Sequence, residues 1–201
     1  MTDILAVVGG YLLGSLTFGY WVPRLVRGED IRTKGSGNVG ASNVFRVYGK
    51  SLGVPVALLD LAKGFAAASL GLWAGGALIG VLAAAAAMVG HARPVFLRFE
   101  KGGKMVATAG GATFALAPLA AACCVVVWLA VFFLTRYASL ASIVTAIALA
   151  VFVVAFGYSW PIVVFGIAGC VAVVAMHHQN IRRLFAGTEH RFQLRRARPS
   201  G

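Results

Sequence analysis

The sequence has little charge and very few acidic side chains: 12% of its 201 residues are charged, and only six are Asp or Glu. An average soluble domain carries about 25% charged residues, so the 60% hydrophobic content excludes a soluble protein of this size. The three cysteines lie in apolar runs, and no group of Cys, His, Asp or Glu has metal-ligand spacing. We therefore expect an all-α, polytopic integral membrane protein without a metal or cofactor.

No cleavable signal peptide is evident, because residues 1–3 carry no positive charge and the first apolar run is long enough to span. The apolar run 105–135 is either one strongly tilted helix or two short helices that turn at Pro118. The second is favoured, because a single helix would place Arg136 on the side opposite the other basic loops. Hydropathy then predicts about seven transmembrane helices, at residues 4–22, 52–73, 75–93, 105–117, 119–135, 139–157 and 159–176.

Seventeen of the 18 Lys and Arg residues lie between the apolar runs, at 23–50, 91–104, 136 and 177–201. Cytoplasmic loops carry such an excess of positive charge, so we expect the N-terminus outside and the C-terminus in the cytoplasm. This bias accounts for most of the net charge of +12, and no nucleic-acid partner is expected. Residues 1–190 are predicted to form one membrane-embedded domain, followed by a flexible basic tail at 191–201.

The first cluster with chemical potential is the Gly-Ser-Asn-rich segment 34–46. Its G-x-G-x-x-G pattern (Gly35, Gly37, Gly40) lacks the preceding strand of a dinucleotide site. Glycines still allow backbone N–H groups to converge on phosphate. Two cations and three neutral hydrogen-bonding side chains accompany them: Lys34, Arg46, Ser36, Asn38 and Asn43. A phosphate site is favoured, and a flexible cytoplasmic loop is the alternative.

Two further clusters lie in the other basic stretches. Gly102 and Gly103 separate two lysines, the second of which is Lys104, just before a predicted helix whose N-terminus would attract an anion. His177 and Asn180 are three residues apart, so one helical face presents both. A basic turn and an interfacial helix end are the respective alternatives.

Two pairs of polar residues lie inside or at the edge of apolar runs. Asp60 and Lys63 are spaced i, i+3 on the second span, where they form either a functional site or a mutually neutralising pair. Ser139 and Ser142 open the sixth span and either cap it or reach a ligand, and capping is favoured.

Taken together, GSGNVGASNVFR at 35–46, KGGKMVAT at 101–108 and HHQNIRRLFAGTE at 177–189 resemble three signature segments of one bacterial enzyme family. This is the membrane-integral glycerol-3-phosphate acyltransferase family that uses acyl phosphate as donor. LLDLAKG at 58–64 and TRYASLAS at 135–142 are similar to that family as well. The resemblance covers essentially residues 1–190.

The resemblance implies a bacterial inner-membrane enzyme whose active site lies near the cytoplasmic face. It would transfer a fatty acyl group from acyl phosphate to the 1-hydroxyl of glycerol-3-phosphate, giving lysophosphatidic acid and phosphate in phospholipid synthesis. Its partners would be these two substrates and membrane lipid, and it would be monomeric. A transporter of anionic or phosphorylated small molecules is the alternative, but only Asp60 and Lys63 offer polar groups near the midplane.

The resemblance also assigns site residues. Arg46 and Lys104 would hold phosphate charge, Ser36 and Asn180 would orient hydroxyls or the carbonyl, and His177 would orient the acceptor hydroxyl or act as the base. The remaining candidates for substrate or phosphate binding are Gly35, Gly37, Asn38, Gly40, Asn43, Gly102, Gly103, Thr108 and Ser142. None of the four histidines has Asp five positions later, which disfavours the soluble-type thioester acyltransferases with a His-x-x-x-x-Asp motif.

Two positions depart from the family pattern. Val39 stands where the family usually has Pro, which would pre-set φ in the turn. Met105 stands where the family usually has Gly, and we expect strain of ~1–2 kcal/mol there if the position requires a positive φ.

Overall fold

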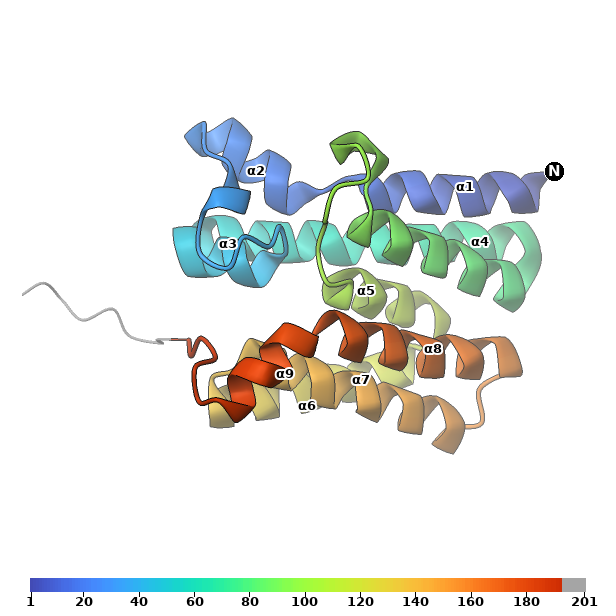
Figure 1. Cartoon of the computed structure of the whole chain (residues 1–201). Helices are drawn as coiled ribbons and strands as arrows, with labels where there is room; N and C mark the ends of the chain where they lie inside the picture. Colours follow the sequence, from blue (N-terminus) through green and yellow to red (C-terminus); the bar gives the residue numbers. More distant parts are fainter. Residues whose placement is uncertain (193–201) are drawn as a thin grey trace, which may run out of the picture.

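The computed structural model describes residues 1–192, and every regular element in this part of the chain is a helix (Figure 1). The predicted all-α class is therefore confirmed. Most of the predicted basic tail, residues 193–201, lies outside the described residues. The elements are, in chain order, α1 Thr2–Ser15, α2 Phe18–Arg27, the 3-10 turn η1 Ile31–Thr33, α3 Ala41–Tyr48, α4 Lys50–Ala92, the 3-10 turn η2 Val95–Leu97, α5 Val106–Leu116, α6 Pro118–Thr135, α7 Ala138–Ala155, α8 Trp160–Met176 and α9 His178–Phe185.

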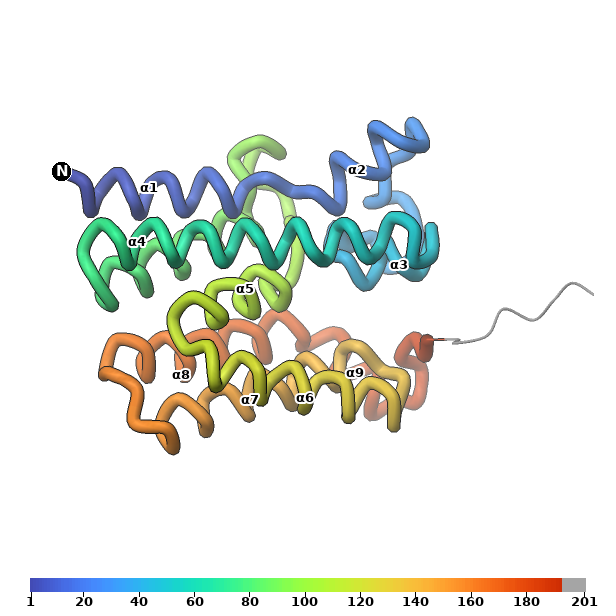
Figure 2. Tube along the Cα trace, turned by 180° about the vertical axis from the view of Figure 1, so that it is seen from behind, coloured from blue at the N-terminus to red at the C-terminus, as the bar shows by residue number. Residues whose placement is uncertain are grey.

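The helices form two layers with α5 between them, as opposite views show in Figures 1 and 2. The first layer holds α1 to α4, with α1 packed along α4, and the second holds α6 to α9. In Figure 1, α2, α3 and α9 lie at one end of the molecule and the N-terminus at the other. We call the former the basic end, because these three helices carry Arg24, Arg27, Arg46, Arg182 and Arg183.

Three of the described helices are long and apolar enough to cross a membrane, and five are if each bent pair counts as one span. The two predicted spans at 52–73 and 75–93 both lie in α4, whose backbone leaves helical geometry at Gly75 and Gly76. Gly76 has φ +71°, a conformation that glycine adopts without a steric penalty. The predicted division near residue 74 therefore corresponds to a real turn between two helices.

The long apolar run 105–135 is divided as predicted. α5 ends at Leu116 and α6 begins with Pro118, while Ala117 between them has φ −148° and ψ 69°. A proline ring disfavours the helical region for the residue before it, and proline itself fits the first turn of a helix. The two short helices therefore follow directly from the position of Pro118.

The predicted single span at 4–22 is broken. α1 ends at Ser15, α2 begins at Phe18, and the two helices are bent by 41°. The backbone carbonyl of Leu16 accepts a hydrogen bond of 2.8 Å from Nζ of Lys63 on α4. A carbonyl released from a helix inside an apolar bundle needs such a partner, so the break is stabilised by tertiary structure.

Small residues bring α1, α4 and α5 into backbone contact. A Cβ on Gly14 would lie 2.0 Å from the carbonyl oxygen of Ala87, and one on Gly64 would lie 1.9 Å from that of Thr108. Neither position has room for a larger residue, in keeping with close helix packing in membranes. Ala83, Ala84 and Ala87 are fully buried, as expected for a packing surface.

Candidate active site

The first Gly-rich loop, residues 34–43, is folded around the buried side chain of Asn43. Its Oδ1 accepts a hydrogen bond of 2.9 Å from the backbone N–H of Ser36. Its Nδ2 donates to the carbonyls of Lys34 and Asn38, at 3.0 and 2.9 Å. Asn43 therefore determines the shape of the loop, and the flexible-loop alternative does not describe it.

Several backbone N–H groups in this loop are engaged within the protein. The N–H of Gly37 donates to the carbonyl of Lys34 at 3.0 Å, and that of Gly40 donates to Oδ1 of Asn38 at 2.8 Å. Gly35 and Gly37 have φ of +58° and +69°, so these two positions suit glycine for conformational reasons. The hydroxyl of Ser36, by contrast, lies on an exposed residue at the loop surface.

Helix α2 holds the same loop from its other side. Val39 is fully buried in an apolar cluster with Ile31, Val44, Leu52 and Val56. A Cβ on Gly19 of α2 would lie only 1.6 Å from the carbonyl oxygen of Val39. The Val39 backbone thus packs directly against a helix.

The second Gly-rich segment is bonded to the end of α4 and to the first loop. The N–H groups of Gly102 and Gly103 donate to the carbonyls of Ala92 and His91, at 2.9 and 3.0 Å. The carbonyl of Gly102 accepts a hydrogen bond of 3.1 Å from Nδ2 of Asn38. The two predicted phosphate loops are therefore one connected unit, and both glycine N–H groups are used inside it.

Met105, which follows this segment, has φ +68° and ψ −11°. This is the left-handed region that L residues other than Gly, Asn and Asp adopt at a cost. Met105 therefore adopts the backbone conformation for which strain was expected, and it is the residue just before α5.

Lys104 connects the second segment to the C-terminal helices. Its Nζ donates a short hydrogen bond to Oδ1 of Asn180, and Nδ2 of Asn180 donates to Oε1 of Glu189 at 2.6 Å. His177 and Lys104 are near enough for the lysine charge to lower the pKa of the imidazole. The structure thus brings together Lys104, His177 and Asn180, of which the bonded pair Lys104 and Asn180 is 76 residues apart in the sequence.

His177 follows the last residue of α8 and is buried. Its Nδ1 lies 2.7 Å from the carbonyl oxygen of Val173, which can only accept, so Nδ1 carries the proton. Nε2 therefore keeps its lone pair. Burial lowers the pKa of His177 to about 4, so the imidazole is neutral at pH 7. The adjacent His178 is exposed and bonds separately to Ala175.

Glu189 is the functional residue that the sequence analysis did not assign. Its carboxylate accepts hydrogen bonds from Ser139 Oγ at 2.7 Å, Asn180 Nδ2 at 2.6 Å and Arg183 Nε at 2.7 Å. Burial raises its pKa, but these three donors outweigh burial, and the pKa is lowered overall. The sequence does hold a signal for this residue, since Glu189 is the only acidic residue after Glu100.

Ser139 and Ser142 do not cap α7, contrary to the favoured interpretation. No side-chain hydrogen bond caps this helix, because the hydroxyl of Ser139 is bonded to Glu189 and that of Ser142 donates to the carbonyl of Ala138 at 2.7 Å.

Thr108 is fully buried, and its hydroxyl has no partner among the described residues.

Arg46 and Lys104 are partly buried cations of this site that form no ion pair within 4.0 Å among the described residues, although the Glu189 carboxylate is near enough to interact with both. Arg32, Lys34 and Arg183 all form ion pairs at this end of the molecule. Burial lowers the pKa of Lys104 to about 8 and also lowers that of Arg46. Neighbouring cations reinforce the effect on both. A phosphate between them would relieve the unfavourable charge, so this pair is typical of an anion site.

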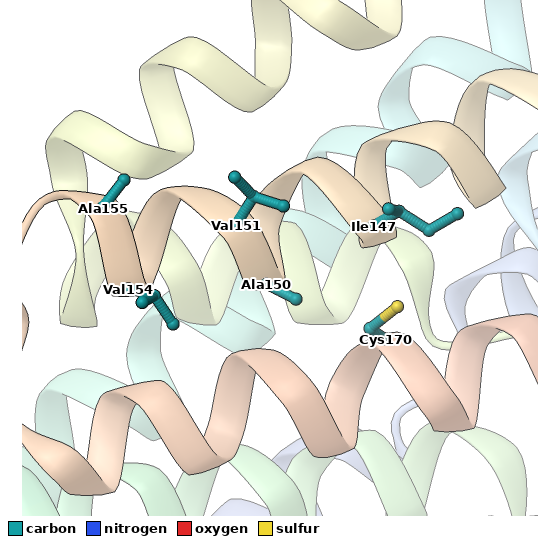
Figure 3. A pocket seen from close by; sticks show the side chains of 6 residues that line it. All are labelled: Ile147, Ala150, Val151, Val154, Ala155 and Cys170. Carbon is teal, nitrogen blue, oxygen red and sulfur yellow. The ribbon is translucent and has the colours of Figure 1, made fainter.

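An apolar groove of about 440 Å³ lies between α7 and α8, away from these polar residues (Figure 3). Figure 3 shows that its side chains come from one face of α7 and from Cys170 of α8. It contains no residue of the polar site, and its lining is Ile147, Ala150, Val151, Val154, Ala155 and Cys170.

Comparisons with known proteins show the family of the chain. Residues 4–187 match the family model described as glycerol-3-phosphate acyltransferase. A glycerol-3-phosphate acyltransferase of Synechococcus sp. strain JA-2-3B'a(2-13) is 47% identical over 191 residues, covering 95% of each chain. One from Aquifex aeolicus is 43% identical over 194 residues, covering 96% of this chain and all of the relative.

Solved structures give the same result at the level of the fold. The chain is similar to the crystal structure of PlsY, an integral membrane glycerol 3-phosphate acyltransferase, in its glycerol 3-phosphate form, with a TM-score of 0.92 and 42% identity over 96% of both chains. For the lysophosphatidic acid form the TM-score is 0.87 at 40% identity. The chain thus belongs to the integral membrane glycerol-3-phosphate acyltransferase family.

Proposed function

We propose that this enzyme transfers a fatty acyl group from acyl phosphate to the 1-hydroxyl of glycerol-3-phosphate, giving lysophosphatidic acid and inorganic phosphate. The observation that carries the proposal is the pair Arg46 and Lys104, whose charges have no carboxylate partner among the described residues, beside the buried His177 and Asn180. Both substrates carry phosphate, which these cations suit. Both forms of the solved relative are named for a ligand of this reaction.

In the proposed reaction, the 1-hydroxyl oxygen forms a bond with the acyl carbonyl carbon. The bond between that carbon and the phosphate oxygen breaks, and inorganic phosphate leaves. The hydroxyl proton goes either to a base or to the departing phosphate. Because the donor is already activated, positioning and charge stabilisation are the main requirements.

The named side chains would divide these tasks as follows. Arg46 and Lys104 hold phosphate charge, and Asn180, fixed between Lys104 and Glu189, orients the reacting groups. His177 offers an unprotonated Nε2, which would accept the hydrogen of the acceptor hydroxyl. Ser36, at the exposed surface of the first loop, would contact substrate.

The role of the glycines is narrower in this proposal than the sequence suggested. Gly35, Gly37, Gly40, Gly102 and Gly103 shape the two loops, and the N–H groups of the last four are bonded within the protein. Side chains then supply the phosphate contacts. Asn38 and Asn43 hold the loops together, and Thr108 and Ser142 remain weaker candidates for substrate binding.

We further propose seven spans, with the N-terminus outside and the site at the cytoplasmic face of a bacterial inner membrane. The spans would be α1, the two halves of α4, α5, α6, α7 and α8. α5 has 11 residues and is ~16 Å long, too short to cross a lipid bilayer alone. Its place between the two layers would shelter it from lipid (Figures 1 and 2).

Two observations support this orientation and a monomeric enzyme. The arginines of α2, α3 and α9 lie together at the basic end (Figure 1), which the positive-inside bias assigns to the cytoplasm. Side chains of a single chain assemble the whole cluster of Arg46, Lys104, His177, Asn180 and Glu189.

The test is phosphate release from palmitoyl phosphate by the purified protein, with and without glycerol-3-phosphate. We expect release to require glycerol-3-phosphate and to yield lysophosphatidic acid. Arg46→Ala should reduce the rate by on the order of 100-fold or more. Arg24→Ala is the matched control, because Arg24 is exposed on α2 and, among residues 1–192, bonds only to the carbonyl of Gly28. Release that is independent of the acceptor would contradict the proposal.

A further inference from the structure

The last described residues, 187–192, form a C-terminal strap that is attached to the second helix layer at both ends. It begins at Gly187, which has φ +68°, and the N–H of Thr188 donates to the carbonyl of Arg183 at 2.8 Å. At its far end the N–H of Phe192 donates to the carbonyl of Arg136 at 2.9 Å. With Glu189 held by three donors between these points, the strap has a defined path.

This path places the ring of Phe192 between the two helix layers. Its centroid lies 5.7 Å from that of Phe45 on α3 and 5.4 Å from that of Phe132 on α6. α3 belongs to the first layer and α6 to the second (Figure 1). Phe192 is thus part of an aromatic contact that joins the layers at the basic end.

The same ring lies beneath the guanidinium of Arg46. The Cζ atom of Arg46 is 5.5 Å from the centroid of Phe192, within the range of a cation–π interaction. No carboxylate among the described residues pairs with this arginine, although Glu189 is near enough to raise its pKa. The ring face is therefore the contact that orients Arg46.

We propose that Phe192 is a positioning residue for Arg46, and this rests on the proposed function. A carboxylate partner would orient the guanidinium but would compete with the substrate phosphate for its N–H donors. An aromatic face orients a cation while leaving its charge and its N–H groups free. The strap thereby prepares Arg46 for the phosphate of glycerol-3-phosphate before the substrate arrives.

The experiment compares Phe192→Leu, Phe192→Tyr, Phe192→Trp and Phe192→Ala in the full-length purified enzyme. Leucine keeps apolar packing but has no π face, whereas tyrosine and tryptophan keep both. We expect Phe192→Leu and Phe192→Ala to raise KM for glycerol-3-phosphate by about 5- to 30-fold. kcat and KM for palmitoyl phosphate should stay within about 3-fold. The Phe192→Tyr and Phe192→Trp variants should keep the wild-type KM for glycerol-3-phosphate.

Phe133→Leu is the matched control, because Phe133 contacts Phe132 from an exposed position on α6. If the KM of Phe192→Leu for glycerol-3-phosphate is as low as that of Phe192→Tyr, the ring contributes packing alone and the proposal is wrong. If Phe192→Ala does not fold, as thermal unfolding in detergent would show, the Leu and Tyr variants still decide. Wild-type enzyme that is inactive with both substrates would contradict the proposed function instead, so the two failures are distinguishable.

Discussion

Lys63 and Asp60 form an ion pair of 2.7 Å, with side chains that are only 2% and 1% exposed. Lys63 Nζ also lies 2.8 Å from Nδ1 of His91 and donates to the carbonyl of Leu16. The imidazole of His91 in turn lies against Gly103, where a Cβ would be 2.0 Å from its Nε2. Of the two readings that the sequence left open, the structure favours the mutually neutralising pair, which also supports the second loop.

We predict that Lys63→Met destabilises the protein by ~3–5 kcal/mol, because it leaves the buried Asp60 carboxylate without a counter-charge. The double variant Asp60→Leu/Lys63→Met should recover much of this loss, since neither charge remains. Thermal unfolding in detergent measures both. A double variant no more stable than Lys63→Met would contradict the ion-pair explanation.

The lowered pKa of Lys104 predicts that substrate binding depends on pH. Burial disfavours its ammonium form and lowers its pKa to about 8, so the charge is present below pH 8 and is lost as pH rises through that value. kcat/KM for glycerol-3-phosphate should therefore decline above pH ~8. Bound phosphate favours the charged form, so kcat should persist to higher pH than kcat/KM.

The comparison that identifies Lys104 as the titrating group is Lys104→Arg. Arginine stays protonated throughout this range, so its kcat/KM profile should stay flat where the wild-type profile declines. An unchanged decline in the arginine variant would assign the titration to another group.

Substitutions at Glu189 and at its hydrogen-bond donor Ser139 should cause graded losses of stability and activity. Ser139→Ala removes one of its three hydrogen bonds and should cost ~1 kcal/mol of stability. Glu189→Gln removes the charge that Arg183 and Asn180 both contact and should cost ~2–4 kcal/mol. The glutamine amide has only one acceptor oxygen, so it cannot serve both Asn180 and Arg183 as the two carboxylate oxygens do. Asn180 is then held less firmly, and kcat should fall further for Glu189→Gln than for Ser139→Ala.

Unfolding midpoints and kcat measured on both variants test this order. Arg182→Ala is the reference, since Arg182 is an exposed residue on the same helix, α9. Equal effects of Glu189→Gln and Arg182→Ala would show that the carboxylate does not organise the site.

The positive φ of Met105 predicts that the Met105→Gly variant is more stable than the Met105→Ala variant. Both substitutions remove the packing of the Met105 side chain against the core, but alanine keeps the strain at φ +68°. Met105→Gly should therefore be ~1–2 kcal/mol more stable than Met105→Ala. Thermal unfolding of the pair gives the answer, and an alanine variant of equal or greater stability would rule out the strain.

Hydropathy predicted most helix boundaries, because a membrane-spanning helix requires an uninterrupted apolar run and its ends are marked by proline, glycine or charge. The turns at Gly75 and Pro118 follow from this rule. The break at Leu16 does not, since it depends on a hydrogen bond from Lys63, 47 residues away. A sequence window contains no trace of such a partner.

The site shows the same division between local and distant information. His177 and Asn180 are three residues apart, so their proximity was predictable from spacing. The predicted shared helical face is wrong, because His177 lies at the junction of α8 and α9, which are bent by 59°. The link from Ser139 to Glu189 spans 50 residues, and it explains why Ser139 was wrongly interpreted as a helix cap. The engagement of the Gly102 and Gly103 N–H groups likewise depends on where α4 ends.

Val39 has a consequence for how the first loop acquires its shape. Its fully buried side chain and its contact with Gly19 hold the turn from outside, whereas a proline would restrict φ within the residue itself. The Asn43 hydrogen bonds lie within the loop itself, whereas the restraint on Val39 comes from α2. With valine at position 39, part of the rigidity of the loop therefore belongs to the tertiary structure, and a peptide of residues 30–50 alone would lack it.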